Sequence, residues 1–340
     1  MNADVAAPAR RAHTNTIENV PRAAVAVALL TAGILVLVRQ VVSRPMVLAD
    51  RFFPGSGWVE IAGLTAYAVF LVHAMASPAG ARRWRPRIWR FFSIAFFAQL
   101  LLGIVGVERC LMTGVLHLPI PALIAAGPAF RGHSFFMVFL FLATVALVGP
   151  SWCSHLCYFG AWDDTAARTR AKPLPLPAWT RLLRPAILGL VILTALGFRY
   201  YGVTGGAAAL AAGGFGIGGV VVMVFASRKS GAMVHCLAWC PIGFAASAGG
   251  KLNPFRIAFN DGCTTCGACT LSCRYDALNP LHIARRKLGF NCTLCGDCLS
   301  ACPHSALEMR FPGLRPGAAR TLYLVIIIAL HASFVGLARI

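Results

Sequence analysis

Seven long apolar segments alternate with short polar or basic stretches along the chain. Each is close to the roughly 20 mostly apolar residues that a helix needs to cross a bilayer. The segments are residues 23–42, 58–77, 89–109, 133–150, 184–203, 207–227 and 320–338. Residues 251–312, between the last two segments, are richer in glycine, proline and polar side chains. The pattern predicts an α-helical polytopic membrane protein of about seven spanning helices with an insert before the last one.

The composition is typical of a membrane protein, which affects how the high positive net charge is interpreted. Of 340 residues, 58% are hydrophobic and 12% are charged, while the net charge is +20. In a soluble protein such a charge would suggest nucleic acid as a partner. Here the basic residues lie mostly in short loops between apolar segments, where they orient helices. We therefore expect membrane lipid, and no nucleic acid, as a partner.

Lysine and arginine predict the orientation of the helices. They gather before the first helix, in the second and fourth loops and after the sixth helix. These residues are Arg10, Arg11, Arg22, Arg82, Arg83, Arg85, Arg87, Arg90, Arg168, Arg170, Lys172, Arg181, Arg184, Arg228, Lys229, Lys251 and Arg256. Seven crossings would put all of them on one side. The positive-inside rule then predicts a bacterial inner (cytoplasmic) membrane protein with a cytoplasmic N-terminus and insert and a periplasmic C-terminus.

The same pattern divides the chain into four parts. We expect a cytoplasmic tail at 1–22, which we interpret as uncleaved, and a six-helix membrane domain at 23–250. The insert follows at 251–312, and a C-terminal transmembrane helix at 313–340 completes the chain.

Eight cysteines of the insert form two copies of one spacing, Cys-x2-Cys-x2-Cys-x3-Cys. The first copy is Cys263, Cys266, Cys269 and Cys273, and the second is Cys292, Cys295, Cys298 and Cys302, followed by Pro303. This is the bacterial ferredoxin spacing, in which the fourth cysteine of each run binds the other cluster. We assign Cys263, Cys266, Cys269 and Cys302 to one 4Fe–4S cluster, and Cys292, Cys295, Cys298 and Cys273 to the second. Zinc sites use separated cysteine pairs, and disulfides do not suit a reducing compartment. The insert is thus predicted to be an α+β two-cluster ferredoxin-like domain.

Four further cysteines form two matching Cys-x3-Cys-x2-Gly motifs, each shortly after a spanning segment. One contains Cys153, Cys157 and Gly160, and the other contains Cys236, Cys240 and Gly243. Two helices separate them, which indicates an internal repeat of two helices and a cysteine elbow. Cysteines at i and i+4 share one helix face. The elbows could hold a metal or a further cluster, cycle between dithiol and disulfide, or pack as small apolar groups.

The two elbows followed by the double ferredoxin motif resemble the NapH/NosR/CcoG group of membrane-bound polyferredoxins, over about residues 130–312. The resemblance implies that Cys153, Cys157, Cys236 and Cys240 are the paired elbow cysteines of that group. It also implies electron movement between the quinone pool or the cytoplasm and a partner outside, or support of cofactor maturation there. Tyr158 stands where the group usually has proline, and Arg274 replaces the proline expected after Cys273.

Other polar residues are expected to be structural. We interpret His73, His133 and His331 as helix-packing residues, and Asp163 and Asp164 as a solvated helix end. His155 and His235 beside the elbows are interpreted as extra ligands, hydrogen-bond donors to ligands or helix caps. The apolar segment 111–132 is expected to lie along the membrane interface, where it would form a quinol pocket or a plug. The basic loop at Arg285, Arg286 and Lys287 would face solvent or lipid, or dock an acidic electron partner.

These motifs favour an electron carrier or redox subunit over a stand-alone catalyst, and no catalytic residues are expected. Electrons would pass between the quinone pool or a cytoplasmic donor and a membrane or periplasmic redox partner. The alternative is an assembly factor that supplies electrons for metal or cofactor insertion into an exported oxidoreductase.

Overall fold

The computed structural model describes residues 15–111 and 118–337. The predicted tail lies outside these residues up to position 14. So do positions 112–117 of the predicted interfacial segment and the last three residues of the C-terminal part.

Seven helices of the described residues are long and apolar enough to cross a membrane. They are α1 (Val20–Val41), α3 (Gly57–Ala74), α4 (Pro78–Ile104), α6 (Phe136–Val148, continued by short turns to Leu156), α8 (Thr180–Tyr200), α9 (Gly205–Val222, continued to Ser230) and α14 (Pro316–Leu337). Each overlaps one predicted segment, so the prediction of a mostly helical protein with seven helices that could span a membrane is confirmed. Which side of a membrane each end faces stays a prediction.

Short elements connect the long helices. In the membrane part they are α2 (Leu48–Phe52), η1 (Glu108–Cys110), α5 (Leu123–Arg131), η2 (Gly149–Ser151), η3 (Trp152–Leu156), α7 (Tyr158–Ala167), η4 (Met223–Ser227), α10 (Arg228–Ser230), η5 (His235–Trp239) and α11 (Pro241–Gly249). In the insert they are β1 (Arg256–Phe259), η6 (Ala268–Ser272), α12 (Pro280–Ala284), α13 (Asp297–Ala301) and β2 (Leu307–Arg310).

Helix α4 begins at Pro78, eleven residues before the predicted start at residue 89. The Oγ atom of Ser77 accepts a hydrogen bond from the Gly80 amide at 3.0 Å, and Pro78 occupies the first turn. Serine at the N-cap followed by proline is a strong helix start. Arg82, Arg83, Arg85, Arg87 and Arg90 are therefore helical residues, not loop residues. Likewise, Arg181 and Arg184 lie in α8.

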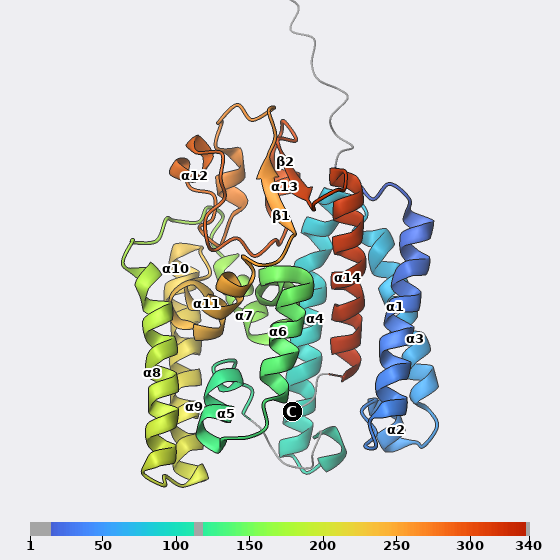
Figure 1. The fold of residues 1–340 in the computed structure, drawn as a ribbon, viewed down its shortest axis with the longest axis vertical. Helices are drawn as coiled ribbons and strands as arrows, with labels where there is room; N and C mark the ends of the chain where they lie inside the picture. The colour runs from blue at the N-terminus through green and yellow to red at the C-terminus, as the bar shows by residue number, and fades with distance from the viewer. Residues whose placement is uncertain (1–14, 112–117, 338–340) are drawn as a thin grey trace, which may run out of the picture.

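The long helices form a bundle with the insert at one end (Figure 1). On one side α1 packs against α3 and α14, and on the other α8 packs against α5, with α4 and α6 between these groups. The chain before α1 lies at the end that carries the insert, because the side chain of Asn15 bonds to β2. Its Nδ2 donates to Leu307 O at 2.7 Å, and its Oδ1 accepts from Met309 N at 3.2 Å.

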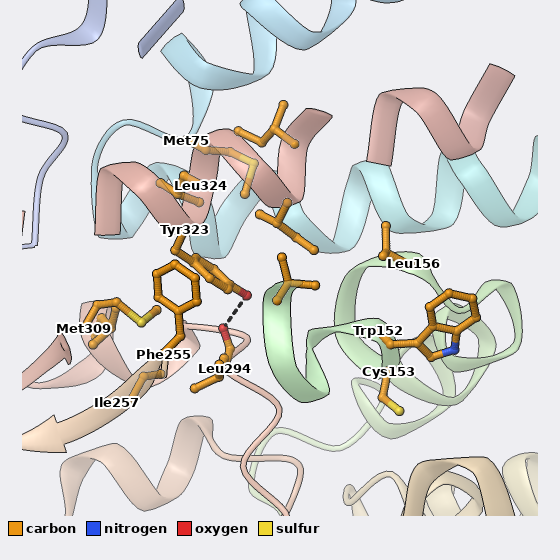
Figure 2. Packing of buried hydrophobic residues seen from close by; sticks show 14 of the residues in the cluster. Met75, Trp152, Cys153, Leu156, Phe255, Ile257, Leu294, Met309, Tyr323 and Leu324 are labelled. Carbon is orange, nitrogen blue, oxygen red and sulfur yellow. Dashed lines mark hydrogen bonds between the residues drawn. The ribbon is translucent and has the colours of Figure 1, made fainter. Parts of the chain in front are cut away.

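The insert is built on a two-stranded antiparallel sheet of β1 and β2, in which Phe259 pairs with Leu307. Its apolar face joins the core of the bundle, so that one cluster of buried side chains runs through both. Figure 2 shows this junction, where Tyr323 of α14 lies against Phe255 with ring centroids 5.5 Å apart. The Tyr323 hydroxyl donates to Leu294 O of the insert at 3.0 Å. The insert is thus fixed to the helices by packing and by directed hydrogen bonds.

The described part of segment 111–132 packs against neighbouring helices, and its expected place at the membrane interface stays a prediction. Helix α5 packs against α8 and α6. Ile120 and Pro121, which precede it, are buried, and Ile120 lies against Gly216 of α9. Residues 118–131, which we call the plug, thus pack onto neighbouring helices, while Leu118 and Arg131 at the two ends of the segment are exposed.

Candidate functional site

The first predicted cluster set comes together in one pocket. Cys263, Cys266, Cys269 and Cys302 all line it, together with Phe259 and Leu307 of the sheet. Because Phe259 pairs with Leu307, the sheet brings the start of the first motif beside the end of the second. Cys266 is exposed, so this pocket is the edge of the insert that is open to water.

The second predicted set lies deeper. The thiol of Cys298 interacts electrostatically with Cys273, Cys292 and Cys295, so the four residues lie near one another. Burial raises the pKa of Cys273, Cys292 and Cys295 to about 12. Thiols in such a place lose their protons only to a strong Lewis acid such as iron. The two sets therefore differ in access. The first includes the exposed Cys266, whereas the second, which we call the enclosed set, has one buried and three partly buried cysteines.

The two ferredoxin motifs have the same backbone. Left-handed residues recur at matching positions, with φ of +56° at Thr265 and +55° at Leu294, then +76° at Gly267 and +79° at Gly296. The last cysteine of each motif accepts a backbone hydrogen bond at its Sγ atom. Ala277 N lies 3.3 Å from Cys273 Sγ, and Ala306 N lies 3.3 Å from Cys302 Sγ. Such N–H···S bonds orient the sulfur and stabilise negative charge on it.

The elbow cysteines form a third set. Cys153, Cys157, Cys236 and Cys240 line a single buried pocket, to which Pro121 of the plug also contributes. All thirteen cysteines of the chain are free thiols in this structure. The sequence left open whether the two elbows meet, and the fold brings them together.

Each elbow is a π-helical turn that ends at its second cysteine. Cys157 has φ −84° and ψ 112°, and Cys240 has φ −76° and ψ 114°, so both leave the turn in the same extended conformation. The spacing predicted that the two cysteines of each pair share one face of a regular α-helix, and this prediction is wrong. Helices α7 and α11 begin at the next residue.

The glycine of each motif has a steric role. A Cβ atom at Gly160 would lie 3.0 Å from Cys153 O, and one at Gly243 would lie 2.9 Å from Cys236 O. In both elbows the glycine thus lets the following helix pack onto the carbonyl of the first cysteine.

Gly160→Ala is expected to distort the first elbow and to lower its iron content. The new Cβ would also lie 2.6 Å from Cζ2 of Trp89, whose Nε1 is held by Cys157 O at 2.7 Å, so the ring cannot move without loss of that bond. Iron and sulfide per protein measure the effect. Gly189→Ala in α8, where nothing lies within 4 Å, is the matched control. Equal iron in both variants would contradict this role of Gly160.

A buried donor at the elbow pocket lacks an acceptor. The Nε1 atom of Trp152, a residue that lines the pocket, is buried and has no hydrogen-bond partner in the described part of the chain. An indole N–H can only donate. A buried donor without an acceptor is costly, and a sulfur atom of a bound group would satisfy it. The residues present therefore fit an electron-rich iron–sulfur group.

The arrangement of the cysteines favours a cluster over one ion. Across residues 15–111 and 118–337, no three His, Cys, Asp or Glu side chains converge closely enough to hold a single metal ion. Four cysteines that line one pocket without such convergence suit a group of several atoms better than one zinc ion.

A buried ion network, which the sequence pattern did not predict, joins the first elbow to the enclosed set. Arg85 of α4 binds Asp297 through Nη2–Oδ2 at 2.8 Å and Nε–Oδ1 at 3.1 Å. Arg168 lies 2.9 Å from the same carboxylate and 2.6 Å from Asp164. Burial favours the neutral form of Asp297, but both arginines together hold its pKa below its ordinary value. Asp297 sits between Cys295 and Cys298, so the network ends at the cluster motif.

Asp163 and Asp164 are therefore not the solvated helix end that the sequence suggested. Both are buried, and Asp163 Oδ2 accepts from Cys236 N of the second elbow at 2.9 Å. Burial raises the pKa of Asp163 to about 6. The pair lies just after the first elbow because its carboxylates connect that elbow to its neighbours.

Arg274 and the histidines take varied places. Arg274 Nη1 does not remain beside Cys273 but donates to Ala167 O at 2.8 Å and Gly231 O at 2.7 Å. The His155 ring contacts Ser154 Oγ, and the His331 ring contacts Tyr67 OH and His155 O. His73 and His133 are exposed. Of these histidines and His235, only His235 is among the residues that line the elbow pocket.

Comparison with known proteins points to the same chemistry. Residues 130–177 match the model of a family described as a 4Fe-4S binding domain. The match contains the first elbow, Cys153 and Cys157, and ends before the second elbow and the insert. No curated protein and no solved structure matches the chain significantly. The resemblance to the NapH/NosR/CcoG group stays a prediction. The chain thus carries a 4Fe–4S binding domain between apolar helices.

Proposed function

We propose that the protein is a membrane-bound electron-transfer protein with three iron–sulfur sites. The observation that carries this proposal is the gathering of twelve cysteines into three sets of four, one of which includes the cysteines of the matched 4Fe–4S domain. Cys263, Cys266, Cys269 and Cys302 would hold the outer cluster. Cys273, Cys292, Cys295 and Cys298 would hold the enclosed one, and the elbow cysteines would hold the third. A 4Fe–4S cluster, when bound, takes up and releases one electron at a time.

The protein residues give the three sites different access. The exposed Cys266 places the outer set where a water-soluble partner can approach. The elbow set is closed by Pro121, Trp152 and Phe159 and lies where the spanning helices end. This difference in access supports electron exchange with a soluble donor at the outer set. It also supports exchange with a quinone or a membrane redox partner at the elbow set.

The basic residues support a cytoplasmic position for the insert. Arg82, Arg83 and Arg87 are exposed at the start of α4, and Arg170 and Lys172 follow α7. The first three lie at the helix end nearest the insert, since Arg85 between them contacts Asp297. By the positive-inside rule this end would face the cytoplasm of a bacterial inner membrane, and the end of α14 would face the periplasm.

The test combines chemical analysis with electron paramagnetic resonance (EPR) on anaerobically purified protein. We expect iron and sulfide equivalent to three clusters, and loss of about four of each per chain in Cys236→Ala/Cys240→Ala, since one 4Fe–4S cluster contains four of each. Samples reduced with dithionite and with a menaquinol analogue should both give cluster signals. Signals with dithionite alone would contradict the quinol link and favour a soluble donor or a maturation role. Iron-poor protein that stays without signals after reconstitution would contradict the proposal.

A further inference from the structure

The internal repeat extends beyond the cysteine elbows to two arginines. Helix α4 contains Arg85 followed by Pro86, and α8 contains Arg184 followed by Pro185. Both arginines are buried: Arg85 is 1% exposed and Arg184 is 4% exposed. Arg82 and Arg181, one turn earlier in the same helices, are exposed. A buried arginine is rare unless it is paired, so its recurrence at the same place in both halves needs a reason.

Each arginine bridges one elbow to the insert. Arg85 Nη1 donates to Ser154 O of the first elbow at 3.2 Å, while its Nε and Nη2 bind Asp297. In the other half, Arg184 Nη1 donates to Cys236 O of the second elbow at 3.3 Å, while its Nη2 donates to Asn291 Oδ1. Asn291 directly precedes Cys292, and Asp297 directly precedes Cys298. Both bridges thus end beside ligands of the enclosed set.

The two guanidinium groups also supply positive charge next to the sulfurs. Arg184 interacts electrostatically with Cys153, Cys236 and Cys240, and Arg85 interacts with Cys295. The two arginines differ in their counter-charges. Arg85 faces Asp164 and Asp297, whereas the direct partners of Arg184 are a carbonyl and an amide. The Nε–H of Arg184 is buried without a partner in the described part of the chain. In the described part of the chain no carboxylate forms an ion pair with Arg184, so its positive charge is not neutralised by a direct partner and can act on the elbow sulfurs.

We propose that Arg85 and Arg184 are paired positioning residues that clamp the enclosed set against the elbow set, and that Arg184 raises the reduction potential of the elbow group. This inference rests on the proposed function, because it concerns the group held by the elbow cysteines. A reduced cluster carries one more negative charge than an oxidised one. A fixed cation in a low-dielectric site stabilises that form and makes reduction easier.

The decisive variant is Arg184→Gln, which keeps a hydrogen-bonding side chain and removes the charge. We expect its elbow group to require a lower potential for half-reduction in an EPR-monitored redox titration. The expected shift is at least a tenfold change in the ratio of reduced to oxidised group, which is about 59 mV for one electron. Arg184→Lys keeps the charge without the fork, so most of the potential should return. Both variants lose the two-pronged bridge to the enclosed set. The magnetic interaction between the EPR signals of the elbow group and the enclosed cluster should therefore be weaker in both variants than in the wild type.

Arg181→Gln is the matched control, since it removes an equal charge from the solvent-exposed side of the same helix. Its potential should equal that of the wild type. A wild-type elbow without iron would contradict the proposed third site and the inference together. A loaded elbow with the same potential in Arg184→Gln and the wild type would overturn the inference alone. So would an equal shift in Arg181→Gln, because the effect would then come from net charge and not from the clamp.

Discussion

Replacing Arg85 with glutamine is expected to destabilise the folded protein by about 3–5 kcal/mol, the usual effect of removing one partner of a buried ion pair. The substitution leaves Asp164 and Asp297 buried with Arg168 as their shared cation. Because Asp297 lies between two cysteines of the enclosed set, the loss should also reduce its iron content. The apparent unfolding temperature in detergent at a fixed scan rate measures the first effect, and iron analysis measures the second.

Two further variants separate this pairing from a general effect of mutation. Arg82→Gln removes an exposed arginine of the same helix and should change stability by no more than about 0.5 kcal/mol. Asp297→Asn introduced together with Arg85→Gln restores charge balance between Arg168 and Asp164. The double variant should therefore lose much less than the sum of the single losses. Additive losses, or an Arg85→Gln variant as stable as Arg82→Gln, would show that the ion network does not hold the insert in place.

Cys302→Ala and Cys273→Ala are expected to remove different clusters, each about four iron atoms per chain. Cys302 ends the second motif but lines the pocket of the first, so its loss should empty the outer set. Cys273 ends the first motif but lies beside Cys292 and Cys298, so its loss should empty the enclosed set. Chelator sensitivity tells the two results apart, because the outer set includes the exposed Cys266.

In Cys302→Ala the cluster that remains in the insert should resist a water-soluble chelator, and in Cys273→Ala it should be sensitive. Cys110→Ala is the control, since Cys110 is buried at the far end of α4 and belongs to none of the three sets. It should retain full iron. The opposite pattern of chelator sensitivity would mean that each motif binds its cluster with its own four cysteines.

Features of this protein that depend on local spacing could be predicted from the amino-acid sequence. Apolar length fixed the seven spanning segments, because a bilayer demands about 20 apolar residues whatever they pack against. Cysteine spacing indicated the two sets of the insert and the repeated elbows. Ser77 and Pro78 also indicate the start of α4. The arginines that follow lower the local hydropathy, so a search for apolar segments places the start of the helix too late, although arginine has a high helix propensity.

Contacts between residues far apart in the chain could not be predicted and are visible only in the folded structure. The elbows are separated by two helices, and their joining in one pocket depends on how α6, α8 and α9 pack. The burial of Asp164 and Asp297 depends on Arg85, which lies far from both in the chain and looked like a loop residue. Arg-Pro in α4 and again in α8 was a visible signal, yet a charge on a helix reveals its partner only once the helices are placed. Spacing encodes local ligand geometry, whereas charge pairing and burial arise from contacts that the folded chain creates.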